Sequence, residues 1–141
     1  MKVNKFLFDL GNVFFDWSPH HVFKRIIPDN NKLNYFINEI AFPHLDTRCD
    51  AGVKIDIAVS EAVQKFPDYE KEIKYYYPNH RNMVNGSYQD SIDIFKKIKF
   101  LGYPCYVLSN WSDETYEGME DQYPFLKEFD GKIISGREFL V

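Results

Sequence analysis

The sequence predicts an α/β fold in which a parallel sheet carries a helical insertion between its first two strands. An apolar run at 3–8 ends in Asp9 and Gly11, and a second apolar run at 103–108 ends in Ser109 and Asn110. Between these runs the apolar residues recur at helical spacing over about seventy residues, which is too long for an ordinary crossover. We therefore expect two neighbouring strand ends, one acidic and one hydrogen-bonding, at the carboxyl edge of the sheet.

Composition and charge favour a globular protein and argue against some classes of partner. The chain has 141 residues, of which 45% are hydrophobic and 18% aromatic, which is typical of one globular domain. A formal net charge of −4 and scattered lysines argue against nucleic acid or an anionic membrane as a partner. No apolar run approaches the roughly 18 residues of a membrane span. Cys49 and Cys105 have no metal-ligand spacing, which favours reduced thiols in a cytoplasmic protein.

The first half of the insertion predicts two helices. Ser18 and Pro19 favour a helix start, and this helix should run to about Ile27. Turn residues follow at 28–31, and a second helix should then run until Pro43 ends it. Its apolar residues lie three and four apart: Leu33, Phe36, Ile37 and Ile40.

The rest of the chain predicts further helices and one more strand. A polar loop is expected at 46–52, followed by a helix that ends at Pro67 and a short helix at 68–77. A helix that stops at Gly102 precedes the second strand. After that strand we expect a helix around 114–121 and a short third strand at 132–135.

Four short motifs resemble those of the haloacid dehalogenase-like (HAD) hydrolases, in the sugar-phosphate phosphatase branch that carries a small helical cap. Residues 8–13 resemble the first motif of that family, and residues 107–110 resemble the second. Asp50-Ala51-Gly52 resembles an acid-x-Gly turn of the cap, and residues 129–136 resemble the strand that precedes the third motif. The order and spacing of these segments extend the resemblance over nearly the whole chain.

The resemblance implies a Rossmann-like core at 1–16 and 87–141 and a helical cap at 17–86. In the family, a lysine and then paired acids at a later strand end follow the segment that is 135–141 here. We therefore interpret the chain as a C-terminally truncated or incompletely represented hydrolase that lacks the third and fourth motifs. The first strand would then expose an apolar edge, and we expect self-association through it.

The resemblance also implies a reaction. An aspartate carboxylate is ionised at neutral pH and can attack phosphorus without a base, and the family pattern assigns this role to Asp9. Mg²⁺ would be held by Asp9 and the backbone carbonyl of Gly11, weakly or not at all because the paired acids are missing. Ser109, Asn110 and the backbone of Leu10 and Gly11 would bind the phosphoryl oxygens.

Three function hypotheses follow. The first is a magnesium-dependent phosphatase that acts on a small phosphorylated metabolite, such as a sugar phosphate, through an aspartyl-phosphate. The second is a 2-haloacid dehalogenase, which ranks lower because dehalogenases typically carry an aromatic residue where Gly11 stands. The third is a catalytically inactive remnant or binding module. Gly11 also replaces the aspartate that usually serves as general acid, so the sequence does not identify the proton donor.

Other residues have less specific interpretations. Asp16 marks either the hinge into the cap or a plain turn, and Arg48 is interpreted as a solvated surface residue rather than an anion contact. Trp111 either lines the pocket or packs in the core. The histidines show no ligand spacing and are expected on the surface or at helix caps: His20, His21, His44 and His80.

Overall fold

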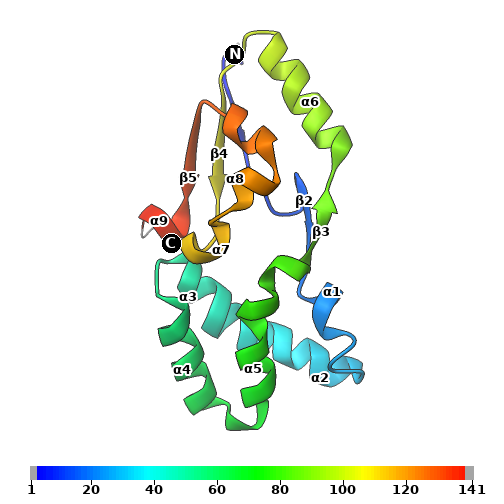
Figure 1. Ribbon diagram of the computed structural model, residues 1–141, viewed down its shortest axis with the longest axis vertical. Coiled ribbons are helices and arrows are strands. Elements are labelled where there is room, and N and C mark those ends of the chain that lie inside the picture. The colour runs from blue at the N-terminus through cyan, green and yellow to red at the C-terminus, as the bar shows by residue number, and fades with distance from the viewer. Residues whose placement is uncertain (1–2, 139–141) are drawn as a thin grey trace.

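The computed structural model describes residues 3–138, and the expectations for the two ends of the chain lie outside them. The protein is a mixed α/β structure with a small parallel sheet and many helices (Figure 1). The sheet has the order β1-β4-β5. Its strands are β1 (Phe6–Phe8), β4 (Cys105–Ser109) and β5 (Gly131–Ile134). The predicted α/β class and all three predicted strands are confirmed.

The register of the sheet brings the expected strand ends together. β1 runs parallel to β4, with Phe8 opposite Val107, and β4 runs parallel to β5, with Ser109 opposite Ile134. Asp9 follows the last residue of β1, and Ser109 is the last residue of β4. Both residues therefore lie at the carboxyl edge of the sheet, where parallel strands place polar groups for function.

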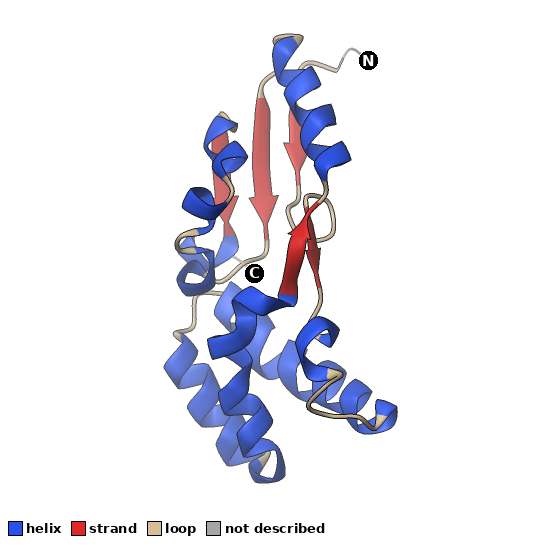
Figure 2. Cartoon of the chain, turned by 45° about the vertical axis from the view of Figure 1, so that its right-hand side comes forward, coloured by secondary structure: helices blue, strands red, loops and turns tan. Residues whose placement is uncertain are grey.

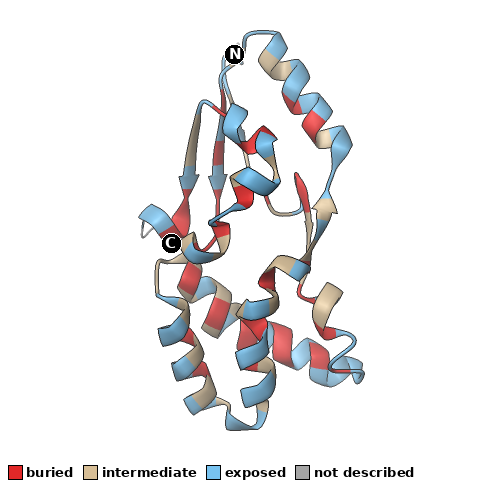
Figure 3. Ribbon diagram, in the orientation of Figure 1, coloured by how far each residue is buried: buried red, intermediate tan, exposed pale blue. Residues whose placement is uncertain are grey.

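One face of the sheet packs on a hydrophobic core. β4 alternates between buried and exposed residues, and its buried side chains belong to the same cluster as residues of the helices that cover this face (Figure 3). These helices are α6 (Gln89–Phe100), α7 (Asp113–Tyr116), α8 (Met119–Gln122) and the 3₁₀ helix η4 (Pro124–Glu128). Aromatic rings dominate the cluster, for example Phe95 stacked on Phe129 at 4.1 Å between ring centroids.

The opposite face of the sheet is bare over the described part of the chain. Leu7 is 63% exposed, and Tyr106, Leu108 and Ile133 on the neighbouring strands are also exposed. β1 pairs with β4 alone among the described strands, so its other edge is open. The exposed apolar edge that the sequence predicted for the first strand is therefore present.

The second cluster of buried residues lies in a helical segment at residues 20–83, beyond the carboxyl edge of the sheet (Figure 1). Its α-helices are α1 (His20–Phe23), α2 (Asn30–Tyr35), α3 (Thr47–Asp50), α4 (Ile55–Lys65) and α5 (Glu70–Tyr76). Its other helices are the π-helix η1 (Phe36–Asp46) and the 3₁₀ helices η2 (Pro67–Tyr69) and η3 (Tyr77–Met83). The predicted helix before Pro67 is confirmed. α1 ends well before Ile27, where its last turn loosens ahead of Pro28.

Two predictions for the region around Pro43 are wrong. Pro43 does not end the helix but lies inside η1, and residues 46–50 of the predicted loop continue it as the end of η1 and α3. In an α-helix the proline ring would clash with the carbonyl group four residues earlier. The wider π-helix accommodates the ring, and buried apolar residues on both sides of Pro43 keep the segment packed.

A short antiparallel ribbon connects the sheet to the helical segment (Figure 2). It consists of β2 (Phe15–Trp17) and β3 (Val84–Ser87), which the sequence did not predict because the alternating pattern is only a few residues long. The predicted boundaries at 17 and 86 fall inside this ribbon. The predicted helix at 114–121 is split into α7 and α8 at Gly118, which has a φ of +78°.

None of the helices within residues 3–138 has both the length and the apolar character that crossing a bilayer requires.

Candidate functional site

A tight turn fixes Asp9 at the carboxyl edge of the sheet. The carbonyl group of Leu10 accepts hydrogen bonds from the backbone N–H groups of Phe14 at 2.9 Å and Phe15 at 3.2 Å. Asn12 closes the turn with a φ of +56°, a left-handed conformation that asparagine tolerates better than most residues. Because the chain reverses directly after β1, Asp9 stays beside the end of β4.

Asp9 and Ser109 are joined by a hydrogen bond although they are 100 residues apart. The Ser109 hydroxyl donates to Oδ1 of Asp9 at 2.8 Å, and the backbone N–H of Leu10 donates to the same oxygen at 2.7 Å. Ser109 is buried, whereas Asp9 is exposed. Within the described chain no hydrogen bond reaches Oδ2 of Asp9, so this oxygen remains available to a ligand.

Asp9 and Ser109 line a cavity of about 540 Å³ between the sheet edge and the helical segment. This volume suits a small metabolite. The sheet side of the cavity is lined by Asp9, Gly11, Asn12, Leu108, Ser109, Asn110 and Trp111. The opposite side is lined by Trp17, Phe42, Asp46, Thr47, Asp50 and His80.

The predicted phosphate-contacting residues separate into two groups. Gly11, Ser109 and Asn110 line the cavity, and the Gly11 N–H has no hydrogen-bond partner within the described residues. Leu10 does not line it: its side chain is fully buried and its N–H is used by Asp9. The N–H of Leu10 therefore orients Asp9, and its predicted contact with a phosphoryl oxygen would require it to leave this hydrogen bond.

Two acids on the helical side of the cavity, Asp46 and Asp50, have raised pKa values. The hydroxyl group of Tyr76 donates to Oδ2 of Asp46 at 2.6 Å. Burial raises the pKa of Asp46 to about 8, and the Tyr76 hydrogen bond opposes that rise only in part. Burial likewise raises the pKa of Asp50 to about 6. Both side chains thus hold a proton more readily than a solvated aspartate does.

Aromatic rings and a neutral histidine surround these acids. The rings of Trp17 and Phe42 stack, with centroids 6.1 Å apart and planes at 30°. The His80 ring lies 6.2 Å from that of Trp17 and 6.4 Å from that of Trp111. His80 is only 8% exposed, and burial lowers its pKa to about 4, so the ring is neutral at physiological pH.

Sequence reasoning missed the helical side of the cavity. His80 was expected on the surface or at a helix cap but is buried, and residues 46–50 were assigned to a loop at 46–52. A signal was present, because Phe42, Asp46 and Asp50 are spaced four apart and so share one helix face. Pro43 concealed this signal, since it favours the end of a helix.

The remaining candidate residues lie at the edge of the site or outside it. Asp16 lies in β2 and accepts hydrogen bonds from His21 in α1 and Asn85 in β3. Arg48 pairs with Glu61 and does not line the cavity, as expected for a surface residue. Trp111 both lines the cavity and is buried. The two cysteines are buried and form no disulfide within the described residues: Cys49 and Cys105.

The donors available for a metal ion are few. Among residues 3–138 no group of three or more histidine, cysteine or acidic side chains is placed to hold a metal. Asp9 and Gly11 line the same cavity and offer a free carboxylate oxygen and a backbone carbonyl. Mg²⁺ prefers oxygen ligands and commonly keeps several waters, so this pair fits a loosely held Mg²⁺.

Comparisons with protein-family models, with curated proteins and with solved structures each returned no match for this chain. We therefore argue the function from the groups that line the cavity. They are the Asp9 carboxylate with one oxygen unpaired, the Ser109 hydroxyl, the Asn110 amide, and on the facing wall Asp46 and Asp50 with raised pKa values.

Proposed function

We propose that the protein is a HAD-like hydrolase, a Mg²⁺-dependent phosphatase that acts on a small phosphorylated metabolite with Asp9 as nucleophile. The observation that carries this proposal is the hydrogen bond from Ser109 to Asp9 at the ends of two adjacent parallel strands, inside a cavity of about 540 Å³. The motifs of the sequence supply the second support, because they place the nucleophile and the phosphate-binding residues at these two strand ends.

Each polar group at the sheet edge would have a defined role in this reaction. Oδ1 of Asp9 is held by two donors, so the carboxylate presents Oδ2 to the phosphorus atom. Attack forms an O–P bond and breaks the bond to the leaving oxygen, which takes a proton from water. Water then hydrolyses the aspartyl-phosphate and restores Asp9. The amide of Asn110 and the free N–H of Gly11 would stabilise the charge on the transferring group. The hydroxyl of Ser109, which donates to Oδ1 of Asp9, would join them by rotating toward the phosphoryl group.

Asp9 and the Gly11 carbonyl would hold Mg²⁺, which when bound offsets the repulsion between the carboxylate and an anionic substrate. In the same proposal, the parallel sheet with its covering helices is a Rossmann-like core. The helical segment at 20–83 is a cap that closes the cavity from the opposite side. Closing a cavity in this way excludes water and strengthens the electrostatic contacts inside it.

The decisive test is hydrolysis of p-nitrophenyl phosphate with and without Mg²⁺ by the wild type and by Asp9→Asn. We expect Mg²⁺-dependent release of phosphate by the wild type and its loss in the variant, because the amide is not a nucleophile for phosphorus. Asp68→Asn is the matched control, since Asp68 is exposed and does not line the cavity. Equal activity of Asp9→Asn and wild type would contradict the proposal.

A binding module is the second candidate, and the sparse metal ligands favour it. In that case phosphorylated compounds would bind at the cavity without turnover, and Asp9→Asn would tighten binding by removing a negative charge. Release of halide from a 2-haloacid without Mg²⁺ would instead identify a dehalogenase. The same purified protein serves all three assays.

A further inference from the structure

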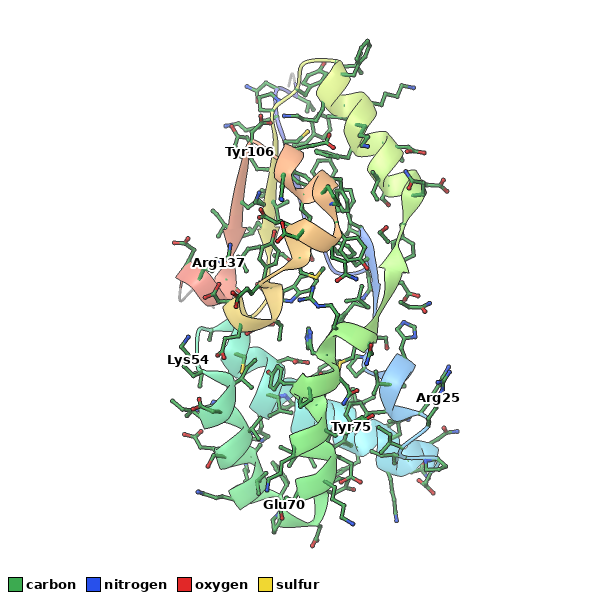
Figure 4. All side chains as sticks on the ribbon, in the orientation of Figure 1. Arg25, Lys54, Glu70, Tyr75, Tyr106 and Arg137 are labelled. Carbon is green, nitrogen blue, oxygen red and sulfur yellow. The ribbon has the colours of Figure 1, made fainter. Side chains whose placement is uncertain are left out.

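The cavity has an excess of acidic groups on the wall opposite the proposed nucleophile. Asp46 and Asp50 line this wall, Asp9 lines the sheet side, and none of the described lining residues is lysine or arginine. Arg25, Lys54 and Arg137, which Figure 4 labels, lie at the outer edge of the molecule in that view. The lining residues therefore supply no positive charge, and Arg81, whose charge acts on the neighbouring His80, donates to the carbonyls of Thr115 and Glu117.

The acidic side chains on this wall retain acceptor capacity. Tyr76 occupies Oδ2 of Asp46, and Oδ1 of Asp46 has no hydrogen-bond partner within residues 3–138. Asp46 and Asp50 are only partly exposed, and burial raises the pKa of each. A cation brought into the cavity would replace the missing solvation and would favour the ionised form of both acids.

A second, independent observation also indicates a ligand. His80 is more than nine-tenths buried and lines the cavity, and its ring nitrogens make no hydrogen bond to any described residue. A neutral imidazole offers one donor and one acceptor. The indole Nε1 of Trp111, which lines the same cavity, is buried without a hydrogen-bond partner among the described residues, and such groups are seldom left unpaired. This wall of the cavity therefore presents polar groups that have no hydrogen-bond partner among the described residues.

Aromatic faces complete this wall. The rings of Trp17 and Phe42 stack, and the His80 ring lies within 6.4 Å of both tryptophan rings. Indole and phenyl faces attract cations within about 6 Å, most strongly where water is excluded. Carboxylates and aromatic faces in one recess are a combination that recognises organic ammonium groups.

We propose that the wall formed by Asp46, Asp50, His80, Trp17 and Phe42 binds a cationic amine, so that the substrate is the phosphate monoester of an amino alcohol. The assignment of the phosphate end rests on the function proposed above, whereas the ammonium subsite rests on this wall alone. In such a substrate the phosphate meets Asp9 and Ser109, and the ammonium group offsets the charge of the facing acids. A neutral polyol would bring no charge to pair with these acids, and Asp46 would keep its proton.

Intrinsic fluorescence can test the subsite without any turnover. The chain has two tryptophans, Trp17 and Trp111, and both line the cavity. Choline, its neutral isostere 3,3-dimethylbutan-1-ol and D-glucose are titrated separately into the wild type at constant ionic strength. We expect choline to change the emission saturably and to bind about tenfold more tightly than the isostere, because only choline carries charge.

Variants of Asp46 and Asp50 test whether these acids cause the preference for choline. Asp46→Asn and Asp50→Asn should each weaken choline binding by about threefold or more and leave the isostere unchanged. Asp68→Asn should bind choline as the wild type does. Circular dichroism checks that each variant folds, and the comparison of choline with its isostere in the wild type stands without any variant.

The outcomes separate the two proposals. Equal affinity for choline and its isostere, tighter binding of glucose, or no binding of choline would overturn the ammonium subsite. Phosphocholine hydrolysed faster than glycerol 3-phosphate would support it together with the phosphatase function. Choline binding without hydrolysis of p-nitrophenyl phosphate would retain the subsite and refute the phosphatase function.

Discussion

Asp46 shows how the surroundings of one residue change its chemistry. It lies at the end of the π-helix η1, accepts a hydrogen bond from Tyr76 and lines the cavity. Burial disfavours its charged form, so its pKa rises to about 8 from the ordinary value of 3.8. The folded protein therefore keeps a proton on Asp46 at pH values where the unfolded chain has lost it.

This difference predicts a stability that falls as pH rises from 6.5 to 8. In that window the folded state binds more protons than the unfolded state, so each pH unit lowers the free energy of unfolding by roughly 1 kcal/mol. Asp50 and His80 contribute mainly at lower pH, because their folded pKa values are about 6 and about 4. Urea denaturation of wild type and Asp46→Asn at several pH values measures the slope.

Asp46→Asn should flatten the slope, because the amide does not titrate. Asp68→Asn should keep the slope of the wild type, since Asp68 is exposed in the short helix η2. A slope that persists unchanged in Asp46→Asn would show that another group is responsible.

At the scale of elements, α9 (Ser135–Glu138) is held against the loop that follows β4 by a close backbone approach. The N–H of Gly136 donates to the carbonyl of Trp111 at 3.1 Å. A Cβ atom at Gly136 would lie 2.8 Å from that carbonyl oxygen and 2.7 Å from the backbone nitrogen of Asp113. This position has no room for a side chain.

Gly136→Ala should therefore destabilise the protein by about 1–3 kcal/mol, because the backbone must shift to relieve the overlap. Gly11→Ala is the matched control, since a Cβ atom there would meet nothing within 4 Å, and its effect on stability should stay within about 0.5 kcal/mol. Urea denaturation of both variants at one pH measures the two changes. Similar stability of Gly136→Ala and wild type would mean that α9 is not held as tightly as its contacts indicate.

The elements also show where sequence patterns suffice. The helix before Pro67 and the helix before Gly102 have long, regular apolar periods and were predicted correctly. η1 was not, because Pro43 is a strong local signal for a helix end and only the packing of its neighbours overrides it. β2 and β3 were missed because three or four residues carry too little periodicity, and their pairing depends on contacts distant in sequence.

At the scale of the whole molecule, the bare face of the sheet and the open edge of β1 predict self-association. Parallel sheets are normally covered on both faces. Here one face exposes Leu7 on β1 and, on the neighbouring strands, Tyr106, Leu108 and Ile133. Static light scattering over a range of concentrations should show an increasing apparent mass. Leu7→Lys should shift the protein toward the monomer, because it places a charge on the exposed face.

Phe100→Lys is the control for a general effect of charge. Phe100 is 90% exposed at the end of α6, outside the sheet face. This variant should associate like the wild type. A monodisperse wild-type monomer, with the amides of β1 protected from hydrogen exchange, would exclude association through this edge.

The sequence by itself determined the α/β class, the three strands of the sheet and the meeting of Asp9 with Ser109. These follow from local patterns, because apolar runs form buried strands and parallel strands bring their carboxyl ends to one edge. Only the tertiary structure decided which groups face Asp9 across the cavity. Asp46 and His80 come from helices whose packing depends on contacts distant in sequence, so their burial and proton affinity exist only in the folded chain.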